Sequence, residues 1–252
     1  SIAESILMCV GAYYWNVSGA IIGYGTGYVV IYLTNKYSIK KLLCKNQLTI
    51  SYSKFIKEDL KILYKFSIPA MLSSLMVGPV FWIVKSLLVR YDGYGQLAIY
   101  EAADQWKIII LFIPSAVSQV AMPILSSLVN VDNRKFWKVL KVNMLFNASI
   151  AFILTLIVML CGNWIMHLYG KDFNDTNTLI ILCLSTVFTA IASVIGLSIS
   201  SRGKMWVGFS FNCIWGLMVI LFSVLFLIIG YGATGIALAI LCSYAINSIT
   251  QY

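Results

Sequence analysis

Long apolar runs with few or no charges constrain this chain more than any other feature of its sequence. A run of about 18 or more such residues can cross the roughly 30 Å hydrocarbon core of a bilayer as a helix. The composition agrees, because 60% of the residues are hydrophobic and 11% are charged, whereas about a quarter of a soluble domain is charged. A membrane β-barrel would show short alternating segments instead. We therefore predict an all-α, polytopic integral membrane protein.

The runs predict about eight membrane-spanning helices. Because the first and last runs lie at the two ends of the sequence, we expect the chain to be a piece of a longer protein. The predicted spans cover residues 2–14, 17–34, 66–89, 97–128, 139–160, 177–199, 206–229 and 235–252.

Positive charge predicts how these spans are oriented. Residues 35–65 hold eight lysines, residues 130–141 hold four Lys or Arg, and residues 200–205 hold two, so fourteen of the eighteen Lys and Arg residues fall in alternate loops. Basic loops stay on the cytoplasmic side of a membrane. We therefore expect these loops to be cytoplasmic, and the net charge of +9 needs no nucleic-acid partner.

A faint internal repeat relates the two ends of the chain. Residues 14–34 align with residues 230–250 at a constant offset of 216, so that Gly19 matches Gly235 and Tyr28 matches Tyr244. Each copy is a short outer turn followed by a helix of small residues. A true repeat implies two homologous helical bundles, which are typical of many secondary transporters.

Charged side chains inside the spans are the strongest sign of function. At about 100° per residue, one side of the helix over 97–128 is polar and the other is apolar. A charge at the centre of a membrane helix costs about 2.5–3.5 kcal/mol. Two readings follow: the lysines pair with the acids and fasten two helices together, or these residues line a hydrated cavity. The polar side carries Glu101, Asp104, Gln105, Lys107, Ser115, Ser118 and Gln119.

The preceding helix supplies a matching polar side. Ser67, Ser74, Gly78 and Lys85 project within about 40° of one another, and Arg90 ends this helix. Pro69 and Pro79 interrupt its backbone, which is tolerated where neighbours or cavity water satisfy the freed carbonyls. The short connection "YDGYGQ" predicts that the two helices are neighbours.

Signals for an enzyme are weak. His167 and Asp172 have the His-x-x-x-x-Asp spacing of membrane acyltransferases, but two residues at one spacing are little evidence. The sequence has no Walker loop, nucleotide fingerprint or zinc spacing, and the six cysteines have neither metal-ligand nor redox spacing. We expect a transporter without a metal or a cofactor, with His167 on a short amphipathic outer turn.

Several motifs together resemble one family. The segments "FSIPAMLSSLMVGPVFWIVKSLLVR" and "YDGYGQLAIYEAADQWKIIILFIPSAVSQVAMPILSSL" resemble Wzx-type O-antigen flippases of the multidrug/oligosaccharidyl-lipid/polysaccharide (MOP) exporter superfamily. The shared elements include Trp82 and the external "LYGKDF" at 168–173. The remaining shared elements are Pro69, the Gly93–Gly95 turn, the patch Ala102, Ala103, Gln105 and Trp106, and the prolines Pro114 and Pro123 with the segment that ends at Ser126.

The resemblance implies two six-helix bundles in an inverted V. Residues 1–34 would be the last two helices of the N-terminal bundle, 35–65 a basic cytoplasmic linker, and 66–252 the whole C-terminal bundle. It implies a place in the bacterial cytoplasmic (inner) membrane and in O-antigen or lipopolysaccharide biosynthesis. The expected activity is translocation of an undecaprenyl-pyrophosphate-linked oligosaccharide by alternating access. Its expected partners are this substrate, membrane lipids and the glycan polymerase machinery.

The chemistry assigns roles to the charged residues under this reading. Pyrophosphate is a dianion that must cross hydrocarbon, and cations in a hydrated cavity would lower that barrier. Lys85, Arg90 and Lys107 are the candidate cations, while Glu101 and Asp104 would couple an ion or pair with the lysines. The candidate cavity-lining residues are Ser67, Ser74, Gly78, Trp82, Gln105, Ser115 and Gln119.

Two alternatives stay open at this point. A drug or cation antiporter of the same superfamily should favour acids over bases in its cavity, and here the two are balanced. A membrane-embedded glycan-modifying enzyme would need His167 for its reaction.

Overall fold

A computed structural model describes residues 2–45, 57–129, 131–170 and 173–251. The ordered elements in these ranges are all helices, and six of them are long and apolar enough to cross a membrane. The chain divides into two compact units, Ser1–Ile56 and Lys57–Tyr252. The chain is therefore a multi-pass helical membrane protein, as the apolar runs predict.

The first unit consists of one helix that folds back on itself. Helix α1 (Ile2–Lys45) is interrupted by non-helical backbone at Trp15 and Asn16, and Asn16 has a positive φ of 52°. The two arms on either side of this kink touch, because a Cβ on Gly11 would collide with the carbonyl oxygen of Gly19. Small residues of this kind let membrane helices approach closely.

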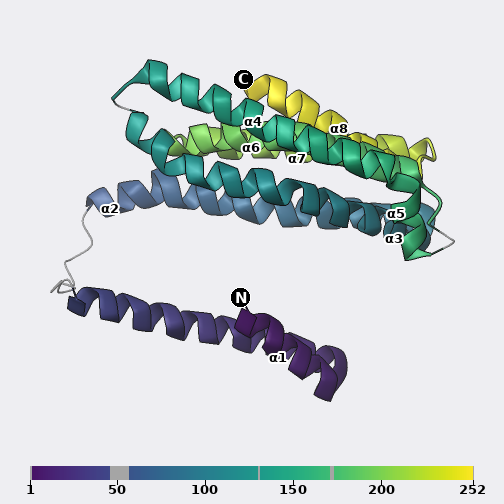
Figure 1. Ribbon diagram of the computed structural model, residues 1–252, viewed down its shortest axis with the longest axis horizontal. Helices are drawn as coiled ribbons and strands as arrows, with labels where there is room; N and C mark the ends of the chain where they lie inside the picture. The colour runs from purple at the N-terminus through teal and green to yellow at the C-terminus, as the bar shows by residue number, and fades with distance from the viewer. Residues whose placement is uncertain (1, 46–56, 130, 171–172, 252) are drawn as a thin grey trace. The chain divides into compact units, whose positions relative to one another are not determined.

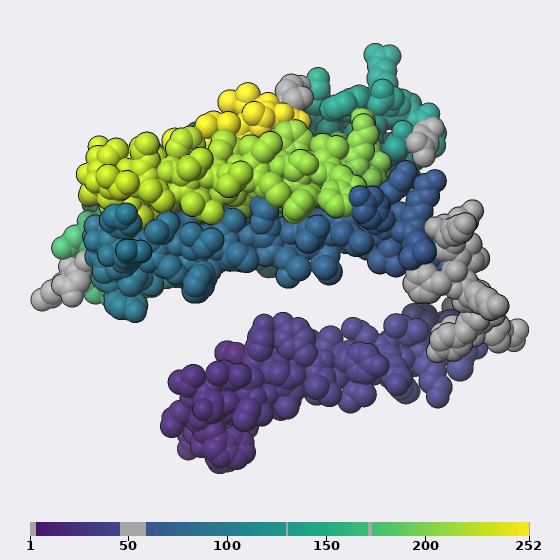
Figure 2. Space-filling model, turned by 180° about the vertical axis from the view of Figure 1, so that it is seen from behind, coloured from purple at the N-terminus to yellow at the C-terminus, as the bar shows by residue number. Residues whose placement is uncertain are grey.

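The second unit is a bundle of helices packed side by side (Figure 1). Figure 2 shows α7 lying along the first part of α3. The elements of this unit are α2 (Lys57–Ile62), a π-helix (Leu63–Ser67), α3 (Ile68–Leu128), α4 (Asn133–Leu160), α5 (Gly162–Tyr169), α6 (Thr176–Ser201), α7 (Met205–Ile228) and α8 (Gly232–Gln251).

The predicted count of about eight spans is not matched, because six helices qualify among the described residues. The spans predicted at 2–14 and 17–34 are both part of α1, and those at 66–89 and 97–128 are both part of α3. The expected loops between them are replaced by one or two non-helical residues, at which each long helix turns back so that its two arms lie against each other. At the α3 kink, Gly93 has a φ of 82°, which glycine adopts without steric cost.

The predicted linker 35–65 is helical where it is described. Residues 35–45 extend α1 and residues 57–65 form α2 and the start of the π-helix, while 46–56 lie outside the described residues. The assignment of 1–34 and 66–252 to two different bundles stays a prediction.

Proline and aspartate explain where several helices begin. Pro69 has no backbone N–H to donate, and it is the second residue of α3, which follows the π-helix that ends at Ser67. Asp132 and Asp175 cap α4 and α6, because their carboxylates accept hydrogen bonds from the backbone N–H groups of Lys135 and Thr178. In the exposed loop before α4, the Lys135 N–H holds the pKa of the Asp132 carboxyl below its usual range.

Contacts at the two ends of the bundle agree with the predicted division of the loops. At one end, the Trp206 indole N–H donates to the Tyr64 carbonyl at 3.1 Å, and the Arg202 guanidinium lies 4.4 Å from the centre of the Phe136 ring. These contacts bring the three predicted cytoplasmic segments together. At the other end, the Gln96 side chain accepts from the Ala233 N–H at 3.0 Å.

Local backbone geometry also repeats at the offset of 216. Asn16 has a φ of 52°, and its counterpart Gly232 has a φ of 53°. A Cβ on Gly19 would lie 2.8 Å from the Cβ of the residue four positions earlier, and for Gly235 the same distance is 2.9 Å. The two segments therefore share a turn and a tight first helical turn, as the sequence alignment predicts.

The core of the second unit explains its cohesion. Large side chains such as Tyr100, Leu182 and Ile236 are fully buried in one cluster that joins α3, α6 and α8. Phe136 and Leu140 form a smaller cluster with Leu125 and Val194 at the end that holds the basic loops. This packing holds the two arms of α3 against the rest of the bundle and so fixes the charged residues on them.

Candidate functional site

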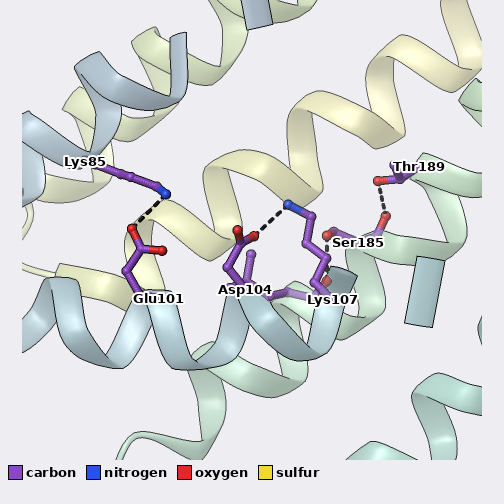
Figure 3. Close-up of polar contacts among 7 residues, drawn as sticks. Lys85, Glu101, Asp104, Lys107, Ser185 and Thr189 are labelled. Carbon is purple, nitrogen blue, oxygen red and sulfur yellow. Dashed lines mark hydrogen bonds and ion pairs between the residues drawn. The ribbon is translucent and has the colours of Figure 1, made fainter. Parts of the chain in front are cut away.

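The Gly93 kink brings the charged residues of α3 together. Lys85 and Glu101 each stand eight residues from Gly93, on opposite arms, and their side chains form an ion pair at 2.7 Å. At 1.5 Å per helical residue, this pair lies about 12 Å from the kink. The Lys85 ammonium also lies 5.7 Å from the centre of the Tyr100 ring. Figure 3 shows Lys85 reaching Glu101 from the neighbouring arm.

A second ion pair lies further along the same arm. The Lys107 ammonium contacts the Asp104 carboxylate at 3.0 Å, one helical turn apart (Figure 3). Only 8% of the Lys107 side chain and 17% of the Asp104 side chain are exposed. The ammonium also lies 5.2 Å from the centre of the Phe81 ring, a favourable contact for a desolvated cation. Both predicted lysines therefore have a carboxylate partner.

The remaining predicted residues occupy more open positions. Arg90 is exposed and forms no ion pair within the described residues. Trp82 is 72% exposed. Among the predicted cavity-lining residues, Ser74 lines the cavity described next. The others are also exposed on the second unit but do not line that cavity: Ser67, Gly78, Gln105, Ser115 and Gln119. Their role in transport stays a prediction.

A cavity of about 430 Å³ lies between α3, α6, α7 and α8. None of its 18 lining residues is charged, and eight of them are Ser, Thr, Asn or Gln. Sequence reasoning missed most of this cavity, because it selected candidate residues around charged side chains and the span at 206–229 carries no charge. Asn212, Asn247 and Gln251 were the available signal, since amides inside membrane helices are uncommon and usually face the bundle interior.

Aromatic rings connect the buried ion pair to this cavity. Phe81, which lies under the Lys107 ammonium, packs edge-on against Trp215 with 5.8 Å between ring centres. Trp215 in turn packs against Tyr244 at 5.2 Å, and both of these rings line the cavity. Thr189, drawn in Figure 3 beside Ser185, lines it from α6. The charged and uncharged sites are therefore neighbours within one bundle.

The weak enzyme motif gains no support from the geometry. His167 is an exposed residue of α5, the short helix that the sequence places on an outer turn, and Asp172 lies outside the described residues. Within the described part of the chain, no three His, Cys, Asp or Glu side chains gather to hold a metal ion.

Comparisons with known proteins place this geometry among transporters. No model of a known protein family matches the chain. The chain is 27% identical over 191 residues to the EPS I polysaccharide export inner membrane protein EpsE of Ralstonia solanacearum. The aligned part covers 75% of this chain and 44% of that protein, so the chain spans less than half the length of this relative.

Solved structures agree on the fold. An outward-facing multidrug resistance MATE family transporter of the MOP superfamily matches 99% of this chain and 59% of its own, with a TM-score of 0.82 at 14% identity. The inward closed lipid II flippase MurJ matches 99% of this chain and 53% of its own, with a TM-score of 0.72 at 19% identity. The predicted resemblance to the MOP superfamily is thus confirmed at the level of the fold, and the relative EpsE is itself an inner membrane protein, in agreement with the predicted location.

Proposed function

We propose that this chain is the C-terminal part of a two-bundle flippase that moves an undecaprenyl-pyrophosphate-linked oligosaccharide, such as an O-antigen repeat unit, across the cytoplasmic membrane. The relatives and structural neighbours are a polysaccharide exporter and MOP transporters, including a lipid II flippase, which supports a transporter rather than an enzyme. The repeated backbone geometry at an offset of 216 supports a second, homologous bundle.

The observation that carries the proposal is the presence of two lysine–carboxylate pairs on neighbouring arms of α3. The carboxylate beside each lysine largely neutralises its charge. The free-energy cost of holding these groups inside the membrane is therefore lower than it would be for unpaired charges. A pyrophosphate that enters the site offers both lysines a stronger, doubly charged partner. Lys85 and Lys107 then hold the substrate, and Arg90 attracts it from its exposed position.

Partner exchange gives the acids a role in coupling. When pyrophosphate takes Lys107, Asp104 becomes an unpaired carboxylate among buried side chains, a state that binding of a proton or a small cation relieves. Glu101 is more exposed and can remain hydrated after it loses Lys85. Release of the substrate restores both pairs and frees the bound ion, so substrate movement and ion movement are linked.

A drug or cation antiporter of the same superfamily remains a second candidate because of the same charge balance. Two lysines and two carboxylates give the site no net positive charge. In an antiporter, Glu101 and Asp104 would bind the cationic substrate. Lys85 and Lys107 would pair with these carboxylates when no substrate is bound. The two candidates differ in which residues touch the substrate.

The full-length protein in liposomes separates the candidates. A fluorescent undecaprenyl-pyrophosphate oligosaccharide in the outer leaflet should become protected from an added, impermeant glycosidase only when the protein is present. Deletion of the gene should leave the lipid-linked glycan in the inner leaflet of the cytoplasmic membrane. Export of a cationic dye without any movement of the glycan would overturn the flippase and favour the antiporter.

A further inference from the structure

We propose that the uncharged cavity between α3, α6, α7 and α8 binds the sugar part of the substrate, while the ion pairs of α3 bind its pyrophosphate. This inference rests on the proposed function and adds a separate site for the glycan. The cavity, of about 430 Å³, lies within the range of small-molecule sites, which is about 300–1,000 Å³.

The lining chemistry selects the class of ligand. A cationic drug needs a carboxylate and a phosphate needs a cation, and none of the lining residues is charged. Nine lining side chains carry a hydroxyl or amide group beside apolar side chains, a combination that suits a neutral molecule rich in hydroxyl groups. Polar side chains at membrane depth are costly and mark substrate pathways.

Several oxygens that line the cavity can still accept a hydrogen bond from a ligand. The hydroxyls of Ser74, Thr189 and Ser193 donate to carbonyl oxygens of their own helices, so their oxygens remain free to accept from a ligand. The Asn247 side-chain oxygen accepts a hydrogen bond from the Gln251 side-chain amide at 3.1 Å, and within the described part of the chain the Gln251 side-chain oxygen has no partner. Sugar hydroxyls can both donate and accept, so they suit these groups.

Trp215 gives an independent sign of a ligand site. Its side chain lines the cavity, the residue is only 3% exposed, and its indole N–H has no hydrogen-bond partner among the described residues. Leaving a buried donor unpaired costs free energy, so a ligand oxygen that accepts a hydrogen bond from it recovers that cost. Tyr244, in contact with Trp215, adds an aromatic edge against which the apolar face of a sugar ring can pack.

Trp106 provides a matched control. Its indole N–H is also buried and has no partner in the ranges that the structure describes, but Trp106 does not line this cavity. Trp215→Phe and Trp106→Phe each remove one unpaired indole N–H and keep an aromatic ring. If burial alone explains the unpaired group, the two changes behave alike. If the cavity binds a sugar, only Trp215→Phe affects it.

Equilibrium binding to the purified full-length protein in nanodiscs tests the proposal. The probes are the oligosaccharide repeat unit released by mild acid from the surface polysaccharide of the source strain, and inorganic pyrophosphate. We expect Trp215→Phe to weaken oligosaccharide binding about tenfold and to leave pyrophosphate binding unchanged. Trp106→Phe should change neither. The Lys107→Gln, Asp104→Asn double variant should lose pyrophosphate binding and keep that of the oligosaccharide.

A second variant guards against misfolding. Asn212 lines the cavity from α7 and is half-buried, so Asn212→Ala should weaken oligosaccharide binding with little cost to folding. Equal oligosaccharide binding by the wild type, Trp215→Phe and Asn212→Ala would overturn the sugar site. If the wild type binds no oligosaccharide but still moves the lipid-linked glycan in liposomes, the sugar site fails and the flippase stands. If no glycan moves in liposomes, the flippase itself fails.

Discussion

The two ion pairs of α3 have the same chemistry in different surroundings. Lys85 and Glu101 join two arms of the helix across 16 residues of sequence, and 31% and 40% of their side chains are exposed. Lys107 and Asp104 are one turn apart on one arm, with 8% and 17% exposed. The first pair fastens the arms at a partly open position of the bundle, and the second is a local pair enclosed by the bundle.

Burial decides what each pair contributes. An exposed pair adds about 0–1 kcal/mol, because water replaces either partner when the other is removed. Removal of one partner from a buried pair lowers the free energy of unfolding by about 3–5 kcal/mol, because the remaining charge is neither paired nor hydrated. A third pair extends the series, since Lys135 contacts Asp132 at 3.3 Å in the loop before α4 with 72% of the lysine side chain exposed. The three pairs therefore predict a graded set of effects.

Lys107→Gln should have the largest effect. It strands Asp104 inside the bundle, so we expect a loss of about 3–5 kcal/mol of stability and little full-length protein in the membrane. Quantitative blotting of membranes and thermal unfolding in detergent would measure both. The double variant Lys107→Gln, Asp104→Asn should recover normal amounts and still fail to export glycan. Restored surface polysaccharide in that variant would make Lys107 a purely structural partner.

Lys85→Gln should have an intermediate effect that separates folding from transport. Because Glu101 can be hydrated, we expect at most about 1 kcal/mol of lost stability and near-normal amounts in the membrane. Glycan export should fall clearly, since Lys85 is a proposed substrate cation. The matched variant Glu101→Gln should keep more export than Lys85→Gln. Equal losses of export in the two variants would mean that only the pair between the arms matters.

Lys135→Gln should have a small effect. The cap of α4 depends on the backbone N–H of residue 135, which the substitution keeps, and the lysine side chain is mostly exposed.

The lowered pKa of Asp132 adds stability above the unfolded-state pKa of this carboxyl, and that stability is lost as the pH falls through the folded-state pKa. Unfolding midpoints between about pH 3 and pH 7 should show this loss in the wild type and not in Asp132→Ala.

His167→Ala should have the smallest effect of all. The imidazole is exposed on α5 and belongs to neither ion pair, so glycan export in a complementation assay should match the wild type. Loss of export with a normal protein level would revive the glycan-modifying enzyme and would make the comparison of the two ion pairs irrelevant to function.

The sequence by itself determined the class of protein and the local features. Apolar length fixes membrane helices because every backbone group must bond within its own segment in lipid. The Lys107–Asp104 pair was within reach of sequence reasoning, because residues three apart on a helix are neighbours. The division of loops between the two ends followed from the positions of Lys and Arg in the chain.

Tertiary structure alone decided the rest. The sequence could not say that the connections at 15–16 and 90–96 would be sharp kinks of one or two residues, because a single residue with positive φ reverses a chain as well as a loop does. It proposed Lys85 and Glu101 for one site, but their 2.7 Å contact depends on how the two arms pack about Gly93. The uncharged cavity is formed by four helices, and its lining residues share no period or motif along the chain. Such a site exists only where packing brings distant polar groups together, so no pattern within one segment could predict it.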